Sequence, residues 1–222
     1  MSPLTAIRAT LEVPENLERP LWPKIEKDRK SMKRLALTLG MFAVAIPTAV
    51  AQTSTWVPDK AHSEVDFSIL HMSLSKVHGR FGNIGGQVVW NDADITKSTV
   101  NVTIDVTTVD TGVGPRDSDL KSGGMFDVDH FPTATFTSTG VSKNGNNLIV
   151  NGNLTLHGVT KPVVLQVEGP TGPKPGMDHR PNAGFSATTT ISRTAFGIGT
   201  KYPSSILGDD VQLNIELDVV KQ

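Results

Sequence analysis

The chain has 222 residues, with 21 Lys and Arg against 22 Asp and Glu, and it contains no Cys. Without Cys, disulfides and thiolate metal sites are excluded, so the burial of apolar side chains has to stabilise the fold. A formal net charge of −1 gives no excess of basic groups for binding a phosphate backbone. We therefore expect no nucleic-acid partner.

Residues 1–31 are polar, carry charges of both signs and contain four prolines. This composition is typical of neither a folded element nor a targeting signal. We interpret these residues as an upstream extension that results from a wrongly assigned start, with translation beginning at Met32. The alternative is an unusually long charged start to the segment that follows.

Residues 32–51 have the order of a secretory signal peptide. A basic pair precedes an apolar run over residues 35–46, and an A-x-A cleavage site ends at Ala51. A membrane-spanning helix is the alternative, but it needs about 20 apolar residues and this run is soon interrupted by Pro47. We therefore expect export and cleavage after Ala51.

Cleavage at this point leaves residues 52–222, which is a suitable length for one domain with a proper core. The mature chain keeps 13 basic and 17 acidic residues, so its net charge is −4. No apolar run after Ala51 is long enough to span a bilayer as a helix.

Alternation with a period of two is the dominant pattern of the mature chain. Apolar and polar residues alternate over residues 98–109 and again over residues 211–219, as in strands with one buried face. Weaker alternation marks residues 65–69, 154–156, 163–167 and 185–191. Thr and Val are abundant throughout, as expected of pleated surfaces.

Turn residues separate these segments. Asn and Gly at residues 144–146 predict a hairpin, because both tolerate positive φ. The Pro- and Gly-rich residues 169–182 and the residues 202–210 predict loops that rim the barrel. Residues 116–123 predict a helical turn or two that ends at a pair of glycines.

Many strands with one apolar face must close on themselves or pair as two sheets, because an open edge invites aggregation. The sequence therefore predicts an all-β fold, and we favour an antiparallel barrel of about eight strands with a short helical segment near residues 116–123. A barrel of this size is either filled by side chains or holds one small ligand. The alternation does not distinguish these two cases.

Polar residues that carry chemistry are sparse. His62, His71 and His78 lack the spacing of metal ligands, and there is no G-x-S-x-G motif or Cys nucleophile. We therefore expect no metal or cofactor, and a binding protein rather than an enzyme. His71 is interpreted as a core histidine with its hydrogen bonds satisfied, or as a polar group that bonds to a ligand head group.

Ordered motifs over nearly the whole mature chain resemble the YceI family of lipid-binding proteins. They are, in chain order, Asp59-x-x-His62-Ser63-x-Val65-x-Phe67-x-Ile69-x-His71, Val77-His78-Gly79-Arg80-Phe81, Asp110-Thr111-Gly112, Arg116-Asp117-x-x-Leu120, Phe126-Asp127, Phe131-Pro132-x-Ala134-x-Phe136-x-Ser138, Gly152-x-Leu154-Thr155-Leu156-His157-Gly158-Val159-Thr160-Lys161-Pro162 and Ser192-Arg193-x-x-Phe196-Gly197-Ile198. The resemblance implies that residues 52–222 form a lipocalin-like, periplasmic barrel whose tunnel holds polyisoprenoids or other long amphiphiles.

This resemblance, together with the alternation, gives a set of candidate ligand-binding residues. We expect the tunnel to be lined by Phe67, Ile69, Phe81, Phe136, Ile191 and Phe196. We place His71 and Arg116 near the mouth as head-group contacts, while Arg116 paired with Asp117 as a purely structural contact is an equally good interpretation. Members of this family are found as dimers, so a homodimer is one expectation, although no exposed strand or patch in the sequence marks an interface. Transient contact of the carrier with membranes is another expectation.

The leading hypothesis is thus a non-catalytic periplasmic protein that carries or sequesters a long-chain lipid such as a polyisoprenoid, an isoprenoid quinone or a fatty-acid derivative. One alternative is an enzyme that acts on such a lipid with His71 as general base. Another is a structural β domain with a filled core.

Overall fold

The computed structural model describes residues 52–222. The predicted extension over residues 1–31 and the predicted signal peptide with its cleavage site at Ala51 lie outside the described residues. The described part is built almost entirely from antiparallel strands, with one α-helix and three short 3₁₀ segments among its elements. The predicted all-β class is confirmed.

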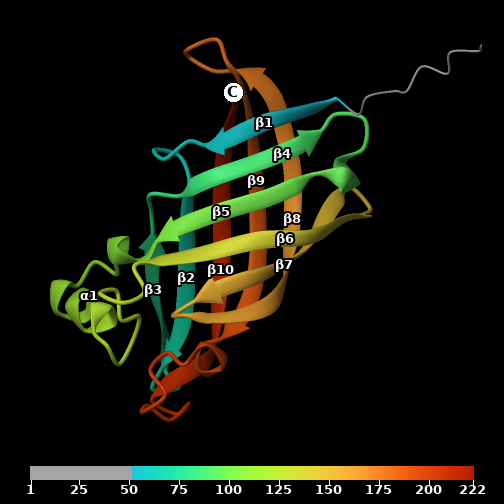
Figure 1. Ribbon diagram of the computed structural model, residues 1–222. Helices are drawn as coiled ribbons and strands as arrows, with labels where there is room; N and C mark the ends of the chain where they lie inside the picture. The colour runs from blue at the N-terminus through green and yellow to red at the C-terminus, as the bar shows by residue number, and fades with distance from the viewer. Residues whose placement is uncertain (1–51) are drawn as a thin grey trace, which may run out of the picture. The chain divides into compact units, whose positions relative to one another are not determined.

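Eight antiparallel strands close into a ring, in the order β1-β4-β5-β6-β7-β8-β9-β10, and β10 pairs back onto β1 (Figure 1). Their bounds are β1 Thr53–Pro58, β4 Gly85–Asn91, β5 Thr99–Asp105, β6 Thr133–Asn144, β7 Asn147–Leu156, β8 Val159–Pro175, β9 Pro181–Ser192 and β10 Leu207–Lys221. This closed ring confirms the predicted barrel and its strand number. Closure removes the free edges that an open sheet would expose.

Two further strands, β2 (Glu64–His71) and β3 (Ser75–Phe81), extend the sheet at one end of the barrel. The last residues of β10 pair with β1, and the part of β10 from Leu207 to Glu216 pairs with β2. β3 lies outside β2 and joins the segment before the helix through one bridge, Arg80 to Asp110. Helix α1 (Gly114–Lys121) and the loops around it lie beside this end (Figure 1).

The predicted strand over residues 98–109 and the predicted helix over 116–123 both differ from the structure at their bounds. β5 ends at Asp105, because the Asp105 carboxylate accepts hydrogen bonds from the backbone N–H and the hydroxyl of Thr107 and starts a 3₁₀ turn. Helix α1 begins two residues earlier than predicted, with Pro115 in its first turn, where proline is favoured.

Residues 169–182 are not the loop that their Pro and Gly content predicts. β8 continues to Pro175 and pairs with β9 from Pro181 onward, which leaves only residues 176–180 as the connection. The register shifts after Glu168 and again after Thr171. These irregularities let the strand continue past its prolines, which cannot donate to a regular ladder. The hairpin predicted at residues 144–146 is confirmed between β6 and β7.

Two glycines make room for phenylalanine rings inside the barrel. A Cβ atom on Gly79 would lie 2.3 Å from Cζ of Phe67, and a Cβ atom on Gly152 would lie 2.3 Å from Cζ of Phe136. Both distances are well inside van der Waals contact. Each ring therefore fills the space beside the glycine that a side chain would otherwise take.

We expect Gly152→Ala to lower the free energy of unfolding by about 1–3 kcal/mol, because the Phe136 ring must leave its place or the strand must shift. The new methyl group would also lie 2.7 Å from the backbone oxygen of Thr137, which cannot move freely. Urea denaturation measures the difference. Gly140→Ala is the matched control, since a Cβ atom there meets nothing within 4 Å. Equal stability of the two variants would contradict this account of the packing.

Candidate functional site

The interior of the barrel holds two adjoining apolar cavities. The upper one has a volume of about 130 Å³ and is lined from β2 and from β4 to β10, with the aromatic rings of Trp90, Phe136 and Phe185 among its walls. Most of the remaining lining is aliphatic: Val88, Val100, Val102, Val150, Val163, Leu165, Val167, Ile215 and Leu217 are examples. We call this cavity the upper chamber.

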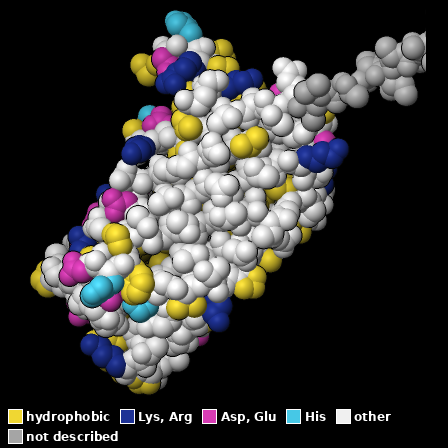
Figure 2. Space-filling model, viewed as in Figure 1, with side chains coloured by type: hydrophobic (Ala, Val, Ile, Leu, Met, Phe, Trp, Pro, Cys, Tyr) yellow, Lys and Arg dark blue, Asp and Glu magenta, His cyan; other side chains and the backbone are white. Residues whose placement is uncertain are grey.

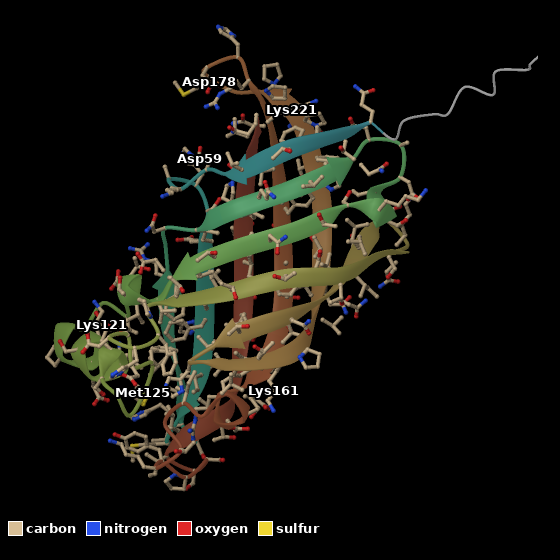
Figure 3. The ribbon with its side chains drawn as sticks, viewed as in Figure 1. Asp59, Lys121, Met125, Lys161, Asp178 and Lys221 are labelled. Atoms are coloured by element: carbon tan, nitrogen blue, oxygen red, sulfur yellow. The ribbon has the colours of Figure 1, made fainter. Side chains whose placement is uncertain are left out.

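The lower chamber has a volume of about 100 Å³ and lies toward the end of the barrel that carries β2, β3 and α1. Its wall includes Leu120 from the helix and Met125 and Phe126 from the loop that follows. Figure 3 shows Met125 and Lys121 on this side of the molecule. The segment around α1 therefore closes the part of the wall that no strand of the eight-stranded ring covers.

Four aliphatic residues line both chambers: Val65, Ile104, Leu154 and Leu213. They come from β2, β5, β7 and β10, so they form a collar around the interior. The two chambers therefore adjoin at this collar, and a chain-like ligand that filled both would have to pass through it.

Inward-facing residues of the barrel keep accessible surface. Val100, Val102, Leu213, Ile215 and Leu217 all line the cavities and are only half-buried. In a filled barrel, side chains at these positions would pack against one another and lose nearly all accessible surface. The retained area indicates a hollow barrel, which answers the question that alternation leaves open. It also disfavours the filled-core interpretation.

The tunnel wall carries almost no polar groups. Its polar side chains are Ser98 and Thr189 in the upper chamber and Arg193 in the lower one. The Ser98 hydroxyl already accepts a hydrogen bond from the backbone N–H of Asn91 at 3.0 Å. Within residues 52–222, no buried side-chain nitrogen or oxygen lacks a hydrogen-bond partner. The wall is therefore suited to hydrocarbon, and two neutral hydroxyls offer little to a charged head group.

Arg193 is 2% exposed and forms the polar floor of the lower chamber. Its guanidinium donates five hydrogen bonds of 2.7–3.0 Å to backbone oxygens. The five acceptors are Gly208, Ile198, Gly199, Tyr202 and Leu207. Because a guanidinium has five N–H donors, all of them are used, and Arg193 has none left for a ligand. It holds the segment before β10 in place.

Asp209 lies beside this arginine. Its carboxylate accepts hydrogen bonds from the Ser192 hydroxyl at 2.6 Å and from the Thr194 hydroxyl at 2.7 Å. These two bonds, assisted by the Thr194 backbone N–H and the charge of Arg193, hold the pKa of Asp209 below its usual range. The ionised carboxylate is thus the form that the fold stabilises.

The lowered pKa of Asp209 gives a pH dependence with a definite sign. A carboxyl group whose pKa is lower in the folded state stabilises the fold above its unfolded pKa, and this contribution disappears as the pH falls through the folded pKa. We expect Asp209→Asn to lose less unfolding free energy than the wild type between pH 7 and pH 3. Chemical denaturation at pH 7 and at pH 3 measures the change in unfolding free energy. Asp119→Asn is the control, because Asp119 is exposed on α1. An unchanged pH dependence in Asp209→Asn would contradict the assignment.

The structure brings five of the predicted tunnel residues to the cavities. Phe67, Ile69, Phe81 and Ile191 line the lower chamber, and Phe136 lines the upper one. Phe67 and Phe81 also pack against each other, with ring centroids 5.3 Å apart. Their contact with a ligand stays a prediction.

The other predicted residues lie elsewhere. Phe196 is buried in the core but lines neither cavity, because it ends a 3₁₀ turn where the alternation of strand faces no longer applies. His71 ends β2 on the same strand face as Ile69, two residues further on, and its side chain is exposed. Its face places it at the rim of the lower chamber.

Arg116 is bound to the loop before the helix. Its Nε donates to the Thr111 hydroxyl at 2.7 Å and its Nη2 donates to the Thr111 backbone oxygen at 2.9 Å. Asp117 accepts from the same hydroxyl and from the Thr111 backbone N–H, so the two residues meet through Thr111 rather than directly. These contacts position α1. A head-group role for Arg116 stays a prediction.

The residues that the sequence analysis missed are mainly aliphatic. Most residues that line the upper chamber are Val, Leu or Ile, and Trp90 adds an aromatic ring, whereas the candidate set emphasised phenylalanines. The sequence does contain a pattern that marks these residues, since Val100, Val102 and Ile104 alternate with polar residues. Alternation identifies the buried face of a strand, but it does not show whether that face contacts a cavity or other side chains.

Residues 52–222 assemble neither a hydroxyl–His–Asp triad nor a cluster of metal ligands. Two Asp–His pairs exist, Asp59–His62 and Asp127–His130, and both histidines are exposed. No Ser or Thr hydroxyl among residues 52–222 hydrogen-bonds to either ring. In the same residues, no three His, Asp or Glu side chains gather as metal ligands, and no helix is long and apolar enough to cross a membrane.

Comparison with known proteins identifies the family. The family model of the YceI-like domain matches residues 56–219. The chain belongs to the YceI-like family. A YceI-like relative from Vibrio cholerae, a UPF0312 protein, is 35% identical over 189 residues, which cover 83% of this chain and 98% of the relative.

Two solved structures agree with the fold. The crystal structure of BcnA from Burkholderia cenocepacia aligns with a TM-score of 0.65 and 27% identity, over 72% of this chain and 98% of BcnA. A polyisoprenoid binding domain from Saccharophagus degradans aligns with a TM-score of 0.56 and 16% identity, over 77% of this chain and all of that domain. At that identity the second likeness concerns the fold alone.

Proposed function

We propose that this protein binds a long-chain amphiphilic lipid without altering it, and that it carries or sequesters this lipid in the periplasm. The observation that carries the proposal is the tunnel: two adjoining chambers with aliphatic and aromatic walls and no free buried polar group. A polyisoprenoid, the tail of an isoprenoid quinone and a fatty-acid derivative all match such a wall. The name of the Saccharophagus degradans domain points toward the first of these.

The physical benefit of enclosure is large. Each buried CH₂ group gains about 0.8 kcal/mol, so a five-carbon isoprene unit costs about 4 kcal/mol when it is exposed to water. A lipid of several units cannot cross an aqueous compartment unless it is covered. The barrel covers the tail, and the head group stays outside because the wall of the upper chamber offers it only the hydroxyls of Ser98 and Thr189.

Location in the periplasm rests on the signal peptide expected over residues 32–51. In the aqueous compartment between two membranes, a tunnel of this kind would shield a lipid tail from water. N-terminal sequencing of the protein isolated from the periplasm should begin at Gln52, and a product found only in the cytoplasm would overturn this part of the proposal.

Extraction of the purified protein with organic solvent tests the function. We expect an intact long-chain lipid at close to one molecule per protein, and the same lipid from a His71→Ala variant. If the wild type instead released a chemically altered product that disappeared in His71→Ala, the enzyme with His71 as general base would be the better account. Absence of any extractable lipid would overturn both.

A further inference from the structure

Exposed apolar side chains gather at the end of the barrel where β2 and β3 meet. Four large hydrophobic residues are exposed there: Leu70, Met72 and Leu74 in the β2–β3 hairpin and Ile206 just before β10. Leu74 is 82% exposed. We call these four residues the apolar tip. Only three other large hydrophobic side chains in residues 52–222 are as exposed, and they lie on other elements.

The apolar tip is one connected surface rather than two separate loops. The backbone N–H of Met72 donates to the oxygen of Ile206 at 2.8 Å, and Leu207 pairs with His71 in the ladder. A Cβ atom on Gly208 would lie 3.1 Å from Cβ of Leu70. The hairpin and the segment before β10 therefore present their apolar side chains together.

The turn of the β2–β3 hairpin has a backbone conformation that neither Met nor Ser prefers. Met72 and Ser73 have φ values of 50° and 57°, a region where Asn and Gly are preferred in hairpin turns. A methionine in this conformation, with half of its side chain exposed, gains little from the fold of the monomer. Its apolar side chain is better explained by a contact outside the molecule.

Two lysines flank the tip, and the acidic residues nearest to it in the chain are Asp209 and Asp210, which follow Ile206 in β10. Lys76 follows the hairpin on β3, Lys201 lies in the segment before β10, and neither the chain between Asp66 and Asp92 nor that between Asp178 and Asp209 contains Asp or Glu. The mature chain as a whole carries a net charge of −4. Lys201 also lies over the ring of half-buried Tyr202, 4.9 Å from its centroid. Figure 2 shows hydrophobic and basic side chains at this lower end.

Exposed aliphatic residues, a tyrosine and two flanking lysines together form the pattern of an interfacial anchor. We propose that the apolar tip docks on an anionic lipid surface, with Leu74 and Met72 inserted and Lys76 and Lys201 at the level of the head groups. Ile69 and Leu207, which line the lower chamber, directly adjoin Leu70 and Ile206 of the tip. Docking would therefore bring the end of the tunnel against the membrane.

Flotation with lipid vesicles tests this proposal. We expect the purified protein to float with vesicles that contain phosphatidylglycerol and much less with vesicles of phosphatidylcholine alone. Leu74→Glu should reduce the bound fraction about tenfold, because it removes an inserted side chain and adds a repelled charge. The matched control is Met177→Glu, since Met177 is fully exposed in the β8–β9 connection beside Asp178, at the opposite end of the barrel (Figure 3).

A second pair of substitutions tests the charges. Lys76→Gln with Lys201→Gln should remove the preference for anionic vesicles, by about fivefold for each lysine. Failure of the wild type to bind vesicles, or an equal loss in Met177→Glu, would overturn the proposal. So would a dimer in solution that Leu74→Glu dissociates, since a second copy of the chain would then cover the tip. The lipid content of every variant, measured by extraction, should stay unchanged and thereby separates docking from the proposed function.

Discussion

Replacement of Arg193 by Met should lower the free energy of unfolding by at least about 3 kcal/mol, a large part of the stability of a typical domain. The five backbone oxygens that the guanidinium now satisfies would lose their donors in a buried site. Their desolvation would no longer be compensated. Methionine retains the apolar stem, so the loss reports the hydrogen bonds more than the packing.

Chemical denaturation measures this loss, and Arg180→Met is the matched control. Arg180 is exposed and its guanidinium bonds to Asp178 at 2.7 Å, so its replacement should change stability by no more than about 1 kcal/mol. Arg193→Lys should also destabilise strongly, because an ammonium group has three donors and lacks the planar fork. If Arg193→Met were as stable as Arg180→Met, the assigned role of this residue would be wrong.

Ala187→Phe should abolish or strongly reduce lipid binding while the barrel stays folded. Ala187 faces the upper chamber from β9, between Val167 on β8 and Ile215 on β10. A phenyl ring at this position would occupy space that the lipid tail needs. Because the chamber is empty of side chains, the added ring causes less strain than it would in a filled core.

The matched control for this variant is the neighbouring Thr188→Phe. Thr188 is exposed on the outer face of the same strand, so the Thr188→Phe substitution adds the same ring without placing it in the tunnel. Delipidated proteins titrated with a polyprenol of defined length give the binding constants. We expect at least a tenfold weaker affinity for Ala187→Phe and an unchanged affinity for Thr188→Phe. Equal affinity in both variants would place the ligand outside the upper chamber.

The fold could be predicted well from the sequence because period-two alternation is a local property. The residues Val211, Leu213, Ile215 and Leu217 show it clearly, and β10 contains them all. Pro and Gly content predicted the loops less reliably than alternation predicted the strands. Residues 169–182 look like a loop, yet bulges carry β8 through them, and such bulges depend on pairing with β9 rather than on local preference.

The site could be predicted only in part. Alternation placed Phe67 and Ile69 on one face, and that face lines the lower chamber. The same rule fails at Phe196, whose 3₁₀ turn has a different period. The role of Arg193 depends on backbone oxygens as far away as Gly208, and no residue type marks such acceptors in a sequence. The collar likewise depends on four strands that meet only in the closed barrel.

Native mass spectrometry of the wild-type protein, isolated without detergent from the cells that make it, tests the central claim most directly. We expect a species heavier than the mature chain by one lipid, which releases an intact long-chain molecule with an apolar tail when it is dissociated. A protein that carries no lipid, and that takes up none of the three lipid classes named above when they are supplied, would contradict the account.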